Sequence, residues 1–300
     1  MDTDKLRALV ELSRLGTMTA VAQATGYGTS AVSHQLAALE RQAGVLLLEA
    51  DGRRVRLTPA GRRLAVHGRA ILAAVTAAEL DLAEQTEPHG LVRVAGYTTV
   101  LRRHLVPELA ELTRSHPAVR LELQEREPTE VEALLDADQI DVGFVYDYSL
   151  VPRTWHHPHT LLSATTMVLA VGDQAEVPDR IRTPSDLNAF RDVEWIGNSR
   201  DSGDDELSTR LAALGGWTPR ISHRADSLEL VVDLVLAGHG VSVLSSDALE
   251  VSRVRTVPLH LAHVERRMWS VTREGAQGWP ATRVVVDHVR ARAHATATVA

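Results

Sequence analysis

A small polar face on one predicted helix is the first feature of this chain that could do chemistry. Ser30, Ser33 and His34 are three and four residues apart, so a helix carries them on one side, with Thr29 at its start. Their side chains both donate and accept hydrogen bonds. Base edges in the major groove of DNA present a readable donor and acceptor pattern to such a helix. We therefore expect these four residues to read double-stranded DNA.

Arginines at a predicted hairpin supply a second kind of chemistry. Asp51-Gly52 is a strong signal for a two-residue turn between strands over residues 46–48 and 54–57. Arg53, Arg54 and Arg56 lie at this turn or just after it, and we expect their guanidinium groups to contact phosphates. A solvated loop is the alternative for these residues taken alone. Beside a DNA-reading helix, phosphate contact is favoured.

The elements that position these side chains form a winged helix-turn-helix over residues 1–58. Thr17 is suited to cap a first helix, and Gly26 allows a sharp turn. The reading helix runs from about Thr29 to Ala43 and ends at Gly44, where a left-handed cap costs glycine least. Its opposite side carries the apolar stripe of Val32, Leu36 and Leu39.

A long helix is expected to link this domain to the rest of the chain, over residues 59–89. Thr58-Pro59 is a favourable helix start, and the pattern continues to about Glu87. Spacings of four and three residues predict a heptad seam made of Leu64, Gly68, Ile71, Val75, Ala78, Leu82 and Gln85. We interpret this helix as a dimerising connector. The alternative is a helix that packs along its own domain.

Residues 90–300 alternate between strand and helix patterns, which indicates an α/β domain with largely parallel pairing. Thr129 and Glu132 predict a capping box for one of its helices. We expect two lobes, lobe I over about 90–162 and 267–300 and lobe II over about 163–266. A small molecule is expected in a cleft between them, where strand ends meet helix starts.

The candidate ligand-binding side chains follow predicted strands in both lobes. Thr98 and Thr99 open a helix, where hydroxyls and backbone N–H groups suit a carboxylate or another anion. Helix capping by either threonine is the compatible alternative. The full set of effector-binding candidates is Thr98, Thr99, Tyr146, Asp147, Asn198, Ser199 and Asp226.

Composition and charge bound the function without naming it. The formal net charge of −7 argues against nucleic acid until its distribution is considered. Basic residues dominate between Arg41 and Arg69, while the acidic surplus belongs to the remainder of the chain. Cysteine is absent, which excludes disulfides and thiol catalysis. We find no signal peptide and no apolar run long enough to span a membrane, so a cytoplasmic protein is expected.

Other signals point weakly to other classes of protein. His156-His157-Pro158-His159 resembles a metal cluster, but the proline breaks the spacing, and we expect no metal site and no cofactor. Gly197 to Asp201 lacks the second glycine of a nucleophile elbow, and we find no catalytic constellation for an enzyme. A solute-binding protein without DNA reading is the alternative function, although it explains only the two-lobed domain.

In this order of parts, the sequence resembles the LysR-type transcriptional regulators. The N-terminal resemblance covers about Leu6 to Leu64 and is specific; the C-terminal one is looser. It is carried at the N-terminus by Ala31-Val32-Ser33-His34-Gln35-Leu36, Leu39-Glu40, Gly44-Val45 and the run from Arg53 to Gly61. In the C-terminal part it is carried by Gly90-Leu91-Val92-Arg93-Val94, Leu105-Val106-Pro107, Ile140-Asp141-Val142-Gly143, Thr183-Pro184-Ser185-Asp186-Leu187 and Leu236-Ala237-Gly238-His239-Gly240-Val241.

The resemblance implies more than the residues do. It implies a C-terminal effector domain like the periplasmic solute-binding proteins, a homodimer or homotetramer, contact with RNA polymerase and a small-molecule effector that changes promoter binding or bending. Gly28-Thr29 stands where the family usually has serine and glutamine, so a glutamine able to reach a base edge is missing. Leu48 and Ala50 replace the usual phenylalanine and arginine at the wing entry, which removes one phosphate contact.

Overall fold

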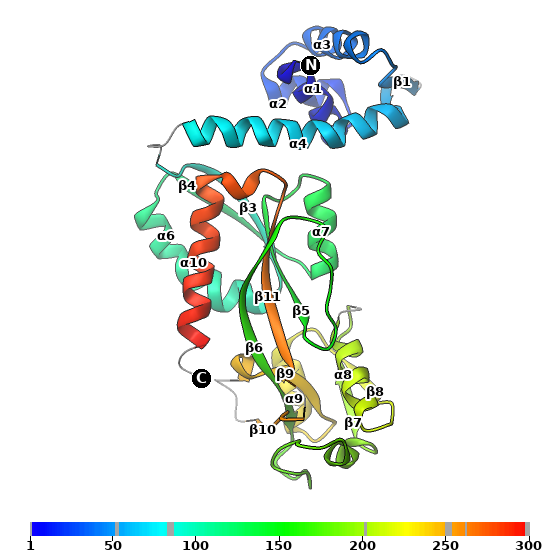
Figure 1. Ribbon diagram of the computed structural model, residues 1–300, viewed down its shortest axis with the longest axis vertical. Coiled ribbons are helices and arrows are strands. Elements are labelled where there is room, and N and C mark those ends of the chain that lie inside the picture. Colours follow the sequence, from blue (N-terminus) through cyan, green and yellow to red (C-terminus); the bar gives the residue numbers. More distant parts are fainter. Residues whose placement is uncertain are drawn as a thin grey trace.

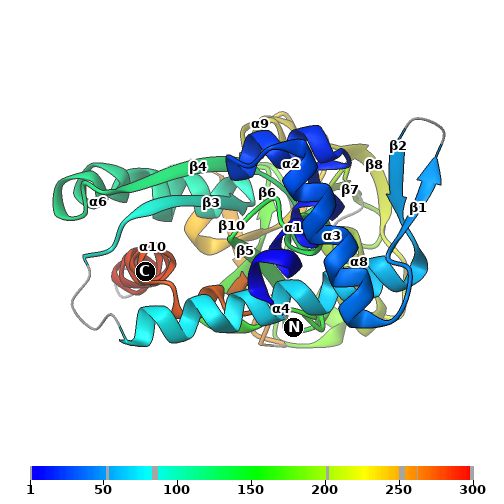
Figure 2. The same ribbon diagram turned by 90° about the horizontal axis from the view of Figure 1, so that it is seen from above.

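The computed structural model describes residues 2–51, 54–82, 87–200, 203–249, 254–261 and 263–297. The molecule is elongated, with a small N-terminal domain at one end and a larger sheet-containing domain below it (Figure 1). The long helix α4, Pro59–Leu82, crosses between the two domains. Seen from above, the hairpin of the N-terminal domain projects at the opposite end of α4 from the C-terminal helix α10, Pro280–Ala297 (Figure 2).

The N-terminal domain has the predicted winged helix-turn-helix order. Helices α1, Thr3–Leu15, α2, Met18–Thr25, and α3, Thr29–Ala43, precede a hairpin of β1, Leu48–Asp51, and β2, Arg54–Leu57. The expected caps are confirmed: the Thr17 hydroxyl accepts a hydrogen bond from Ala20 N at 3.2 Å, and Gly26 and Gly44 both have left-handed backbones.

The first strand of the wing begins later than predicted. Leu47 is buried in the core of the domain, whereas Leu46 is 72% exposed and precedes the strand. Consecutive leucines do not alternate in polarity, so the sequence alone could not fix which one turns inward. The wing therefore starts at Leu48.

Helix α4 starts where predicted, and its first turns belong to the N-terminal domain. The Thr58 hydroxyl accepts a hydrogen bond from Gly61 N at 3.0 Å. Gly61 is needed for close approach, because a Cβ there would lie 2.1 Å from the carbonyl oxygen of Leu47. Gly68 of the predicted seam lies against α1, where an added Cβ would meet Leu6 and Val10 at 3.0 Å. This part of the seam therefore packs along its own domain, which was the alternative to a dimer contact.

At Ile71 and Val75 the apolar side of the same helix is accessible. Ile71 is 42% exposed and Val75 is half-buried, so this part of the seam has an accessible apolar side. Helix α4 is described to Leu82, and Gln85 of the predicted seam lies outside the described residues. Glu87, the predicted end of the helix, is described and is not helical. That the exposed part of α4 around Ile71 and Val75 joins two copies of the chain stays a prediction.

A mixed sheet forms the centre of the C-terminal domain. Its strand order is β10-β6-β11-β5-β3-β4, with β9 also pairing β6. The strands are β3, Gly90–Gly96, β4, Val119–Glu125, β5, Val142–Tyr148, β6, His159–Val171, β9, Ser242–Ser245, β10, Arg255–Pro258, and β11, Glu265–Thr272.

The expectation of largely parallel pairing is wrong for this sheet. β3 is parallel to β4 and β5, but β6, β9, β10 and β11 pair antiparallel. The cause is β11, which returns from lobe II and inserts between β5 and β6. β6 pairs with β11 over residues 159–166 and with β9 and β10 over residues 167–171, so one strand serves both lobes. The expected lobe boundary at 162/163 falls inside it.

Helices cover both faces of the sheet. The helical stretch from α5, Thr98–Val100, through a π-helical segment, Leu101–Leu105, and a 3-10 turn, Val106–Glu108, to α6, Leu109–Ser115, lies on one face with α10. Helix α7, Pro128–Asp136, covers the other face. Its N-cap is Glu127 with Glu130, so the capping box expected at Thr129 and Glu132 is wrong. Pro128 suits the first helical position and starts the helix earlier.

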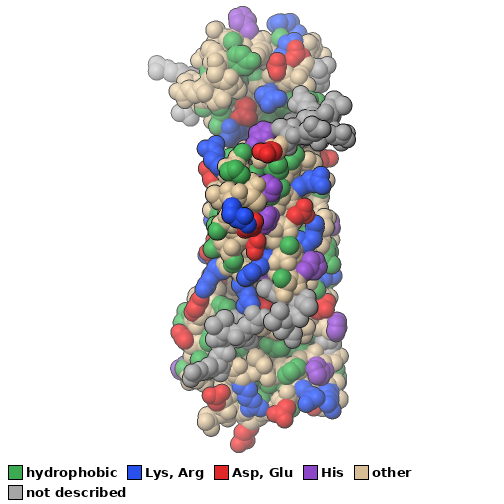
Figure 3. Space-filling view, turned by 90° about the vertical axis from the view of Figure 1, so that its left-hand side faces the viewer, with side chains coloured by type: hydrophobic (Ala, Val, Ile, Leu, Met, Phe, Trp, Pro, Cys, Tyr) green, Lys and Arg blue, Asp and Glu red, His purple; other side chains and the backbone are tan. Residues whose placement is uncertain are grey.

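Lobe II completes the domain with a small parallel pair and two helices. β7, Glu194–Gly197, pairs with β8, Arg220–Arg224, and the helices are α8, Gly203–Leu214, and α9, Leu228–Leu236. Short 3-10 segments are η3, Pro184–Phe190, η4, Ser246–Leu249, and η5, Ala276–Gly278. On the side that carries α6 and α10, charges of both signs are interspersed (Figure 3). Among the described residues, no helix has the length and hydropathy to cross a membrane.

Candidate nucleic-acid interface and effector site

Helix α3 separates its two sides as the sequence predicts. Val32, Leu36 and Leu39 are 0–1% exposed and pack into the N-terminal core. The side chains of the predicted reading face, Thr29, Ser30, Ser33 and His34, are all exposed. Because their side of the helix is not used in packing, it is open to a partner.

The carboxylate of Glu40, near the end of α3, connects this helix to the wing. Glu40 accepts hydrogen bonds from the backbone N–H of Leu47 at 2.8 Å and of Leu48 at 3.0 Å. The Thr58 hydroxyl donates to the carbonyl of Leu46 at 2.8 Å from the other end of the hairpin. These bonds hold the wing at a set position relative to the reading face.

The wing carries a partner for one of its arginines that sequence reasoning missed. Glu49 and Arg56 are directly opposite in the β1–β2 register, and Arg56 Nε lies 2.8 Å from Glu49 Oε1. The pair is exposed, so it is weak and leaves Arg56 able to exchange Glu49 for a phosphate. Arg54 lies in β2, but its side chain, like all of Arg53, lies outside what the structure describes.

Not every basic residue between Arg41 and Arg69 faces the same way. Arg62 donates to the carbonyl of Leu57 at 2.8 Å, beside the wing. Arg69 turns toward the C-terminal domain, where its Nε lies 3.2 Å from Asp138 Oδ2 and its Nη1 donates to the carbonyl of Asp136 at 2.7 Å. The basic residues between Arg41 and Arg69 therefore do not form one surface, because Arg69 is used in the contact between the domains.

The two lobes meet at a group of polar side chains, which we call the lobe junction: Tyr97, Glu127, Tyr146, Tyr148, Asn198 and Asp204. On the lobe I side, Tyr146 donates its hydroxyl to Glu127 Oε2 at 3.0 Å. Tyr148, on the same side of β5, donates its hydroxyl to Asp204 at the start of α8. The rings of Tyr97 and Tyr146 stack edge to face at 4.8 Å. Hydrogen bonds thus connect the lobes directly.

The predicted residues of lobe II lie together beside this junction. Asn198 donates from its side chain to Asp204 Oδ2 at 3.2 Å. The backbone N–H of Ser199 donates to Asp226 Oδ1 at 3.0 Å, and Arg200 lies 3.2 Å from Asp226 Oδ2. Asn198, Ser199 and Asp226 are therefore brought together as expected.

The lobe I candidates divide between the junction and other places. Thr98 donates its hydroxyl to Glu125 Oε1 at 2.7 Å, and Thr99 is half-buried next to it. The N-cap of α5 is Tyr97, without a side-chain cap bond, so helix capping by Thr98 or Thr99 is wrong.

Asp147 does not face the junction. Its carboxylate accepts hydrogen bonds from Arg267 Nε at 2.8 Å, from Trp269 Nε1 at 2.9 Å and from the backbone N–H of Arg153 at 2.9 Å. Strand alternation places Tyr146 with Tyr148 on one side of β5 and Asp147 on the other. That same period of two was the signal that could have found Tyr148, whereas Glu127 and Asp204 are brought in by other elements.

Burial raises the pKa of four side chains of the lobe junction and so favours their neutral forms: Tyr97, Glu127, Tyr146 and Tyr148. Burial raises the pKa of Glu127, the Tyr146 hydrogen bond opposes this, and the negative charge of Asp204 adds to it. Burial also raises the pKa of Tyr97 to about 12. Neutral phenols beside carboxylates offer both donors and acceptors, a set that suits recognition of a polar ligand.

The histidine cluster does not converge on a common point. His156 lies 3.3 Å from Glu132, whereas His157 lies 3.2 Å from Asp136. Within the described ranges, no group of His, Asp and Glu side chains has the arrangement to hold a metal ion.

Comparisons with known proteins agree with this architecture. Residues 3–62 match the model for the bacterial regulatory helix-turn-helix proteins of the lysR family, and residues 85–294 match the LysR substrate binding domain. The chain belongs to the LysR family of bacterial transcriptional regulators, which bind DNA and are not enzymes.

Individual relatives extend over nearly the whole chain. It is 27% identical to the uncharacterized HTH-type transcriptional regulator YfeR of Shigella flexneri, over 97% of this chain and 94% of the relative. It is 28% identical to the HTH-type transcriptional regulator CbbR of Rhodospirillum rubrum, over 91% of this chain and 90% of the relative.

Solved structures share the fold. A full-length OxyR variant from Pseudomonas aeruginosa superposes with a TM-score of 0.70 at 19% identity, covering 97% of this chain and 98% of that one. The regulator CbnR, solved in complex with its target DNA, gives a TM-score of 0.52 at 23% identity, covering 98% of this chain and 100% of that one.

Proposed function

We propose that this regulator reads its operator with the exposed face of α3 and contacts the flanking phosphates with its wing. The observation that carries the proposal is the division of α3 into a buried apolar side and an exposed side of Thr29, Ser30, Ser33 and His34. Small hydroxyls and an imidazole there can approach base edges closely. The operator sequence differs from that of relatives in this proposal, because Gly28-Thr29 replaces the usual serine and glutamine.

We also propose that the lobe junction binds a small effector that carries a carboxylate and a hydrogen-bond donor. Support for the donor comes from Glu127 and Asp204, whose oxygens are the acceptors of the junction. Support for the carboxylate comes from Arg200, whose guanidinium group lies 3.2 Å from Asp226 beside the lobe junction. An amino acid or hydroxy acid combines both groups, which refines the expected carboxylate.

The remaining parts of the proposal concern assembly and place. The exposed apolar side of α4 around Ile71 supports a homodimer or homotetramer joined through this helix. A regulator of promoters acts where the chromosome and RNA polymerase are, so we propose a cytoplasmic protein that contacts the polymerase. A measurement of the mass of the protein in solution tests the oligomeric state.

Fluorescence anisotropy with DNA from upstream of the protein's own gene, beside a shuffled control, tests this function. We expect sequence-selective binding with a steep salt dependence. Ser33→Ala is expected to reduce the preference for the upstream DNA by about fivefold to a hundredfold, the range for one base contact. Thr209→Ala, an exposed hydroxyl on α8, is the matched control. Unchanged affinity of Ser33→Ala for every sequence would count against the reading face.

The same assay with amino acids and hydroxy acids added tests the effector site. An effector that shifts the DNA affinity of the wild type is expected to have no effect on Tyr148→Phe, which loses the hydrogen bond to Asp204. An equal shift in both proteins would place the effector elsewhere.

A further inference from the structure

One short helix, α7, reaches both the lobe junction and the linker helix α4. Its N-cap is Glu127, a residue of the lobe junction, which accepts a hydrogen bond from the Tyr146 hydroxyl at 3.0 Å. Its last residue is Asp136, whose carbonyl accepts a hydrogen bond from Arg69 Nη1 of α4 at 2.7 Å. The 9 residues of α7 span about 14 Å, at roughly 1.5 Å per residue. In Figure 1, α7 lies between the level of α4 and the level of α8.

The residue that Tyr146 contacts is part of the first turn of α7. The backbone N–H of Glu127 donates to Glu130 Oε2 at 2.8 Å. The carbonyl of Glu127 accepts hydrogen bonds from the N–H groups of Glu130 and Val131, both at 3.0 Å. A change of partner at the Glu127 carboxylate therefore acts directly on the start of the helix.

The turn that follows α7 is bonded to the helix as well. Gln139 N donates to the carbonyl of Leu134 at 2.9 Å, and Asp138 N donates to that of Leu135 at 3.1 Å. These two bonds form a Schellman motif, and Asp138 is its left-handed residue with a φ of 56°. Because the turn is bonded to the last turn of the helix, Asp138 moves with α7.

The sheet side of α7 is closely packed. Val131 and Leu135 are buried in one cluster with Val145 of β5. Gly143 of β5 allows the close approach, since an added Cβ there would lie 2.2 Å from Val131 Cγ1. A helix that is internally bonded at both ends and packed in this way shifts as one unit, because closely packed contacts do not deform continuously.

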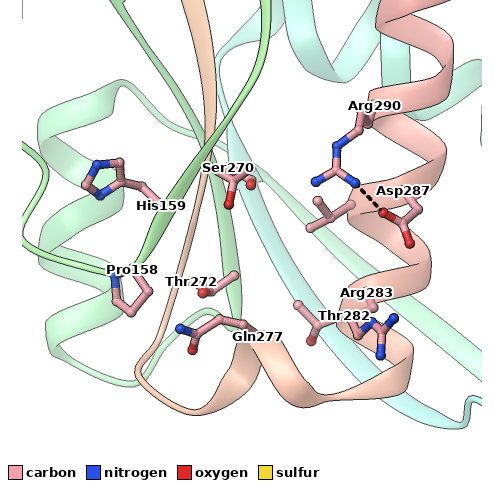
Figure 4. Close-up of a pocket in the computed structure, with 11 residues that line it drawn as sticks. Pro158, His159, Ser270, Thr272, Gln277, Thr282, Arg283, Asp287 and Arg290 are labelled. Carbon is pink, nitrogen blue, oxygen red and sulfur yellow. Dashed lines mark hydrogen bonds and ion pairs between the residues drawn. The ribbon is translucent and has the colours of Figure 1, made fainter.

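At the other end of this connection, Asp138 contacts α4. Its carboxylate lies 3.2 Å from Arg69 Nε and 3.1 Å from Arg273 Nη1. Arg273 follows Thr272, the last residue of β11, which lines a groove beside α10 together with Gln277 of η5 (Figure 4). η5 itself packs against α4. The C-terminal domain thus contacts α4 through the end of α7 and through η5.

We infer that α7 transmits the state of the lobe junction to the DNA-binding domain. A ligand whose donor replaces the Tyr146 hydroxyl at Glu127 shifts the start of α7, and the end of the helix passes this shift to Arg69. Helix shifts of about 1–2 Å are a known form of such coupling. The ligand rests on the proposed effector site, whereas the connection through α7 is a property of the unliganded chain.

Hydrogen exchange of the full chain without any effector tests the connection. Tyr146→Phe removes the hydroxyl that contacts Glu127, and exchange is expected to become about threefold to tenfold faster in residues 128–139 and in α4 after Arg69. Arg69→Ala removes the α4 side of the connection. In the Arg69→Ala background, adding Tyr146→Phe is expected to speed exchange in α7 and to add nothing in α4.

Tyr148→Phe is the matched control, because Tyr148 lies on the same side of β5 but donates its hydroxyl to Asp204 of α8. It is expected to speed exchange at the start of α8 and to leave α4 unchanged. Unchanged exchange in α4 of Tyr146→Phe would overturn the role of α7. An equal increase in α4 of Tyr148→Phe would overturn it too, as would a further increase in α4 when Tyr146→Phe is added to Arg69→Ala.

These outcomes are independent of the effector titration, since no effector is added. If no amino acid or hydroxy acid shifts the DNA affinity but exchange changes as expected, the effector site is wrong and the connection through α7 stands. If an effector shifts the DNA affinity and Tyr146→Phe leaves exchange in α4 unchanged, the effector site stands and the role of α7 is overturned.

Discussion

Single buried residues set the response of this protein to pH, and His104 is the clearest case. It lies in the π-helical segment before α6, is 5% exposed, and its Nδ1 has no hydrogen-bond partner among the described residues. Burial lowers the pKa of His104 from 6.5 to about 4, and the positive charges of Arg266, Arg103 and Arg292 add to this against the opposing Asp247. The side chain is therefore neutral at physiological pH.

The sign of the resulting pH dependence is fixed. The unfolded chain takes up a proton at His104 near pH 6.5, whereas the folded protein does so only near pH 4. The contribution of neutral His104 to the free energy of unfolding is therefore fully present above pH 6.5 and is lost as the pH falls from 6.5 to about 4. From pH 7.5 to pH 5 the loss due to His104 is about 2 kcal/mol at most.

Urea unfolding at pH 7.5 and pH 5 measures this contribution. His104→Gln is expected to lose about 2 kcal/mol less than the wild type over the interval, because glutamine does not titrate. His260→Gln, an exposed histidine, is the control and should follow the wild type. Equal slopes for wild type and His104→Gln would show that His104 is not held neutral.

Among the elements, the wing hairpin contains a glutamate that neutralises one of its arginines. Arg56 pairs with Glu49 across the strands, so its approach to a phosphate replaces one partner with another. We expect Arg56→Ala to weaken binding to all DNA sequences similarly and to reduce the salt slope by about one. Glu49→Gln should strengthen binding to all sequences, because it releases Arg56.

Anisotropy titrations over a salt series measure both effects. Arg114→Ala removes an exposed arginine that is also paired with a nearby glutamate, but on α6, and is expected to leave the slope unchanged. If Arg56→Ala instead relaxed sequence preference, the wing would be reading bases. A weaker affinity in Glu49→Gln would show that Glu49 supports the wing and does not compete for Arg56.

Elements defined by local chemistry could be predicted from the sequence. The caps at Thr17, Gly44 and Thr58 and the apolar stripe of α3 depend on residues within one or two turns, and all are found. The place of β11 between β5 and β6 depends on pairs of residues about a hundred or more positions apart. No local pattern encodes that insertion, so the pairing direction and the lobe boundary do not follow from the sequence.

The candidate site shows the same division. The proximity of Asn198, Ser199 and Asp226 could be predicted, because polar residues at strand ends and helix starts gather in α/β domains; their role in effector binding stays a prediction. The expectation for Asp147 is wrong, because side chains alternate along β5 and its neighbours Tyr146 and Tyr148 are the ones that face the junction. Glu127 and Asp204 meet Tyr146 and Tyr148 only when α7 and α8 pack against β5, so nothing in the sequence marks them.

For the whole molecule, the contact between α4 and the sheet domain decides how ligand sites reach the DNA-binding domain. Asp138 is 6% exposed and lies between Arg69 of α4, at 3.2 Å, and Arg273 after β11, at 3.1 Å. Its backbone has a φ of 56°, uncommon for a residue other than glycine, which turns the chain so that the carboxylate meets both arginines. Arg93 and Asp141 extend the network into β3 at 2.8 Å.

Replacing Arg69 should weaken the contact between α4 and the C-terminal domain and leave the rest of the structure unchanged. In Arg69→Ala the carboxylate of Asp138 keeps Arg273, so the expected cost is about 1–3 kcal/mol, below that of a buried charge left without any partner. Hydrogen exchange of the full chain should become roughly tenfold faster in α4 after residue 69 and in the turn at 136–141 for each 1.4 kcal/mol lost.

Arg210→Ala, which removes an exposed ion pair on α8, is the control and should leave exchange in α4 unchanged. If Arg69→Ala also left α4 protected, the helix would be held by the packing of η5 alone, and the ionic network would not carry a signal between the domains. If exchange increased in α4 as expected, Asp138 would be the residue that joins the sheet of the C-terminal domain to the helix that carries the DNA-binding domain, since Arg273 reaches that carboxylate from the end of β11.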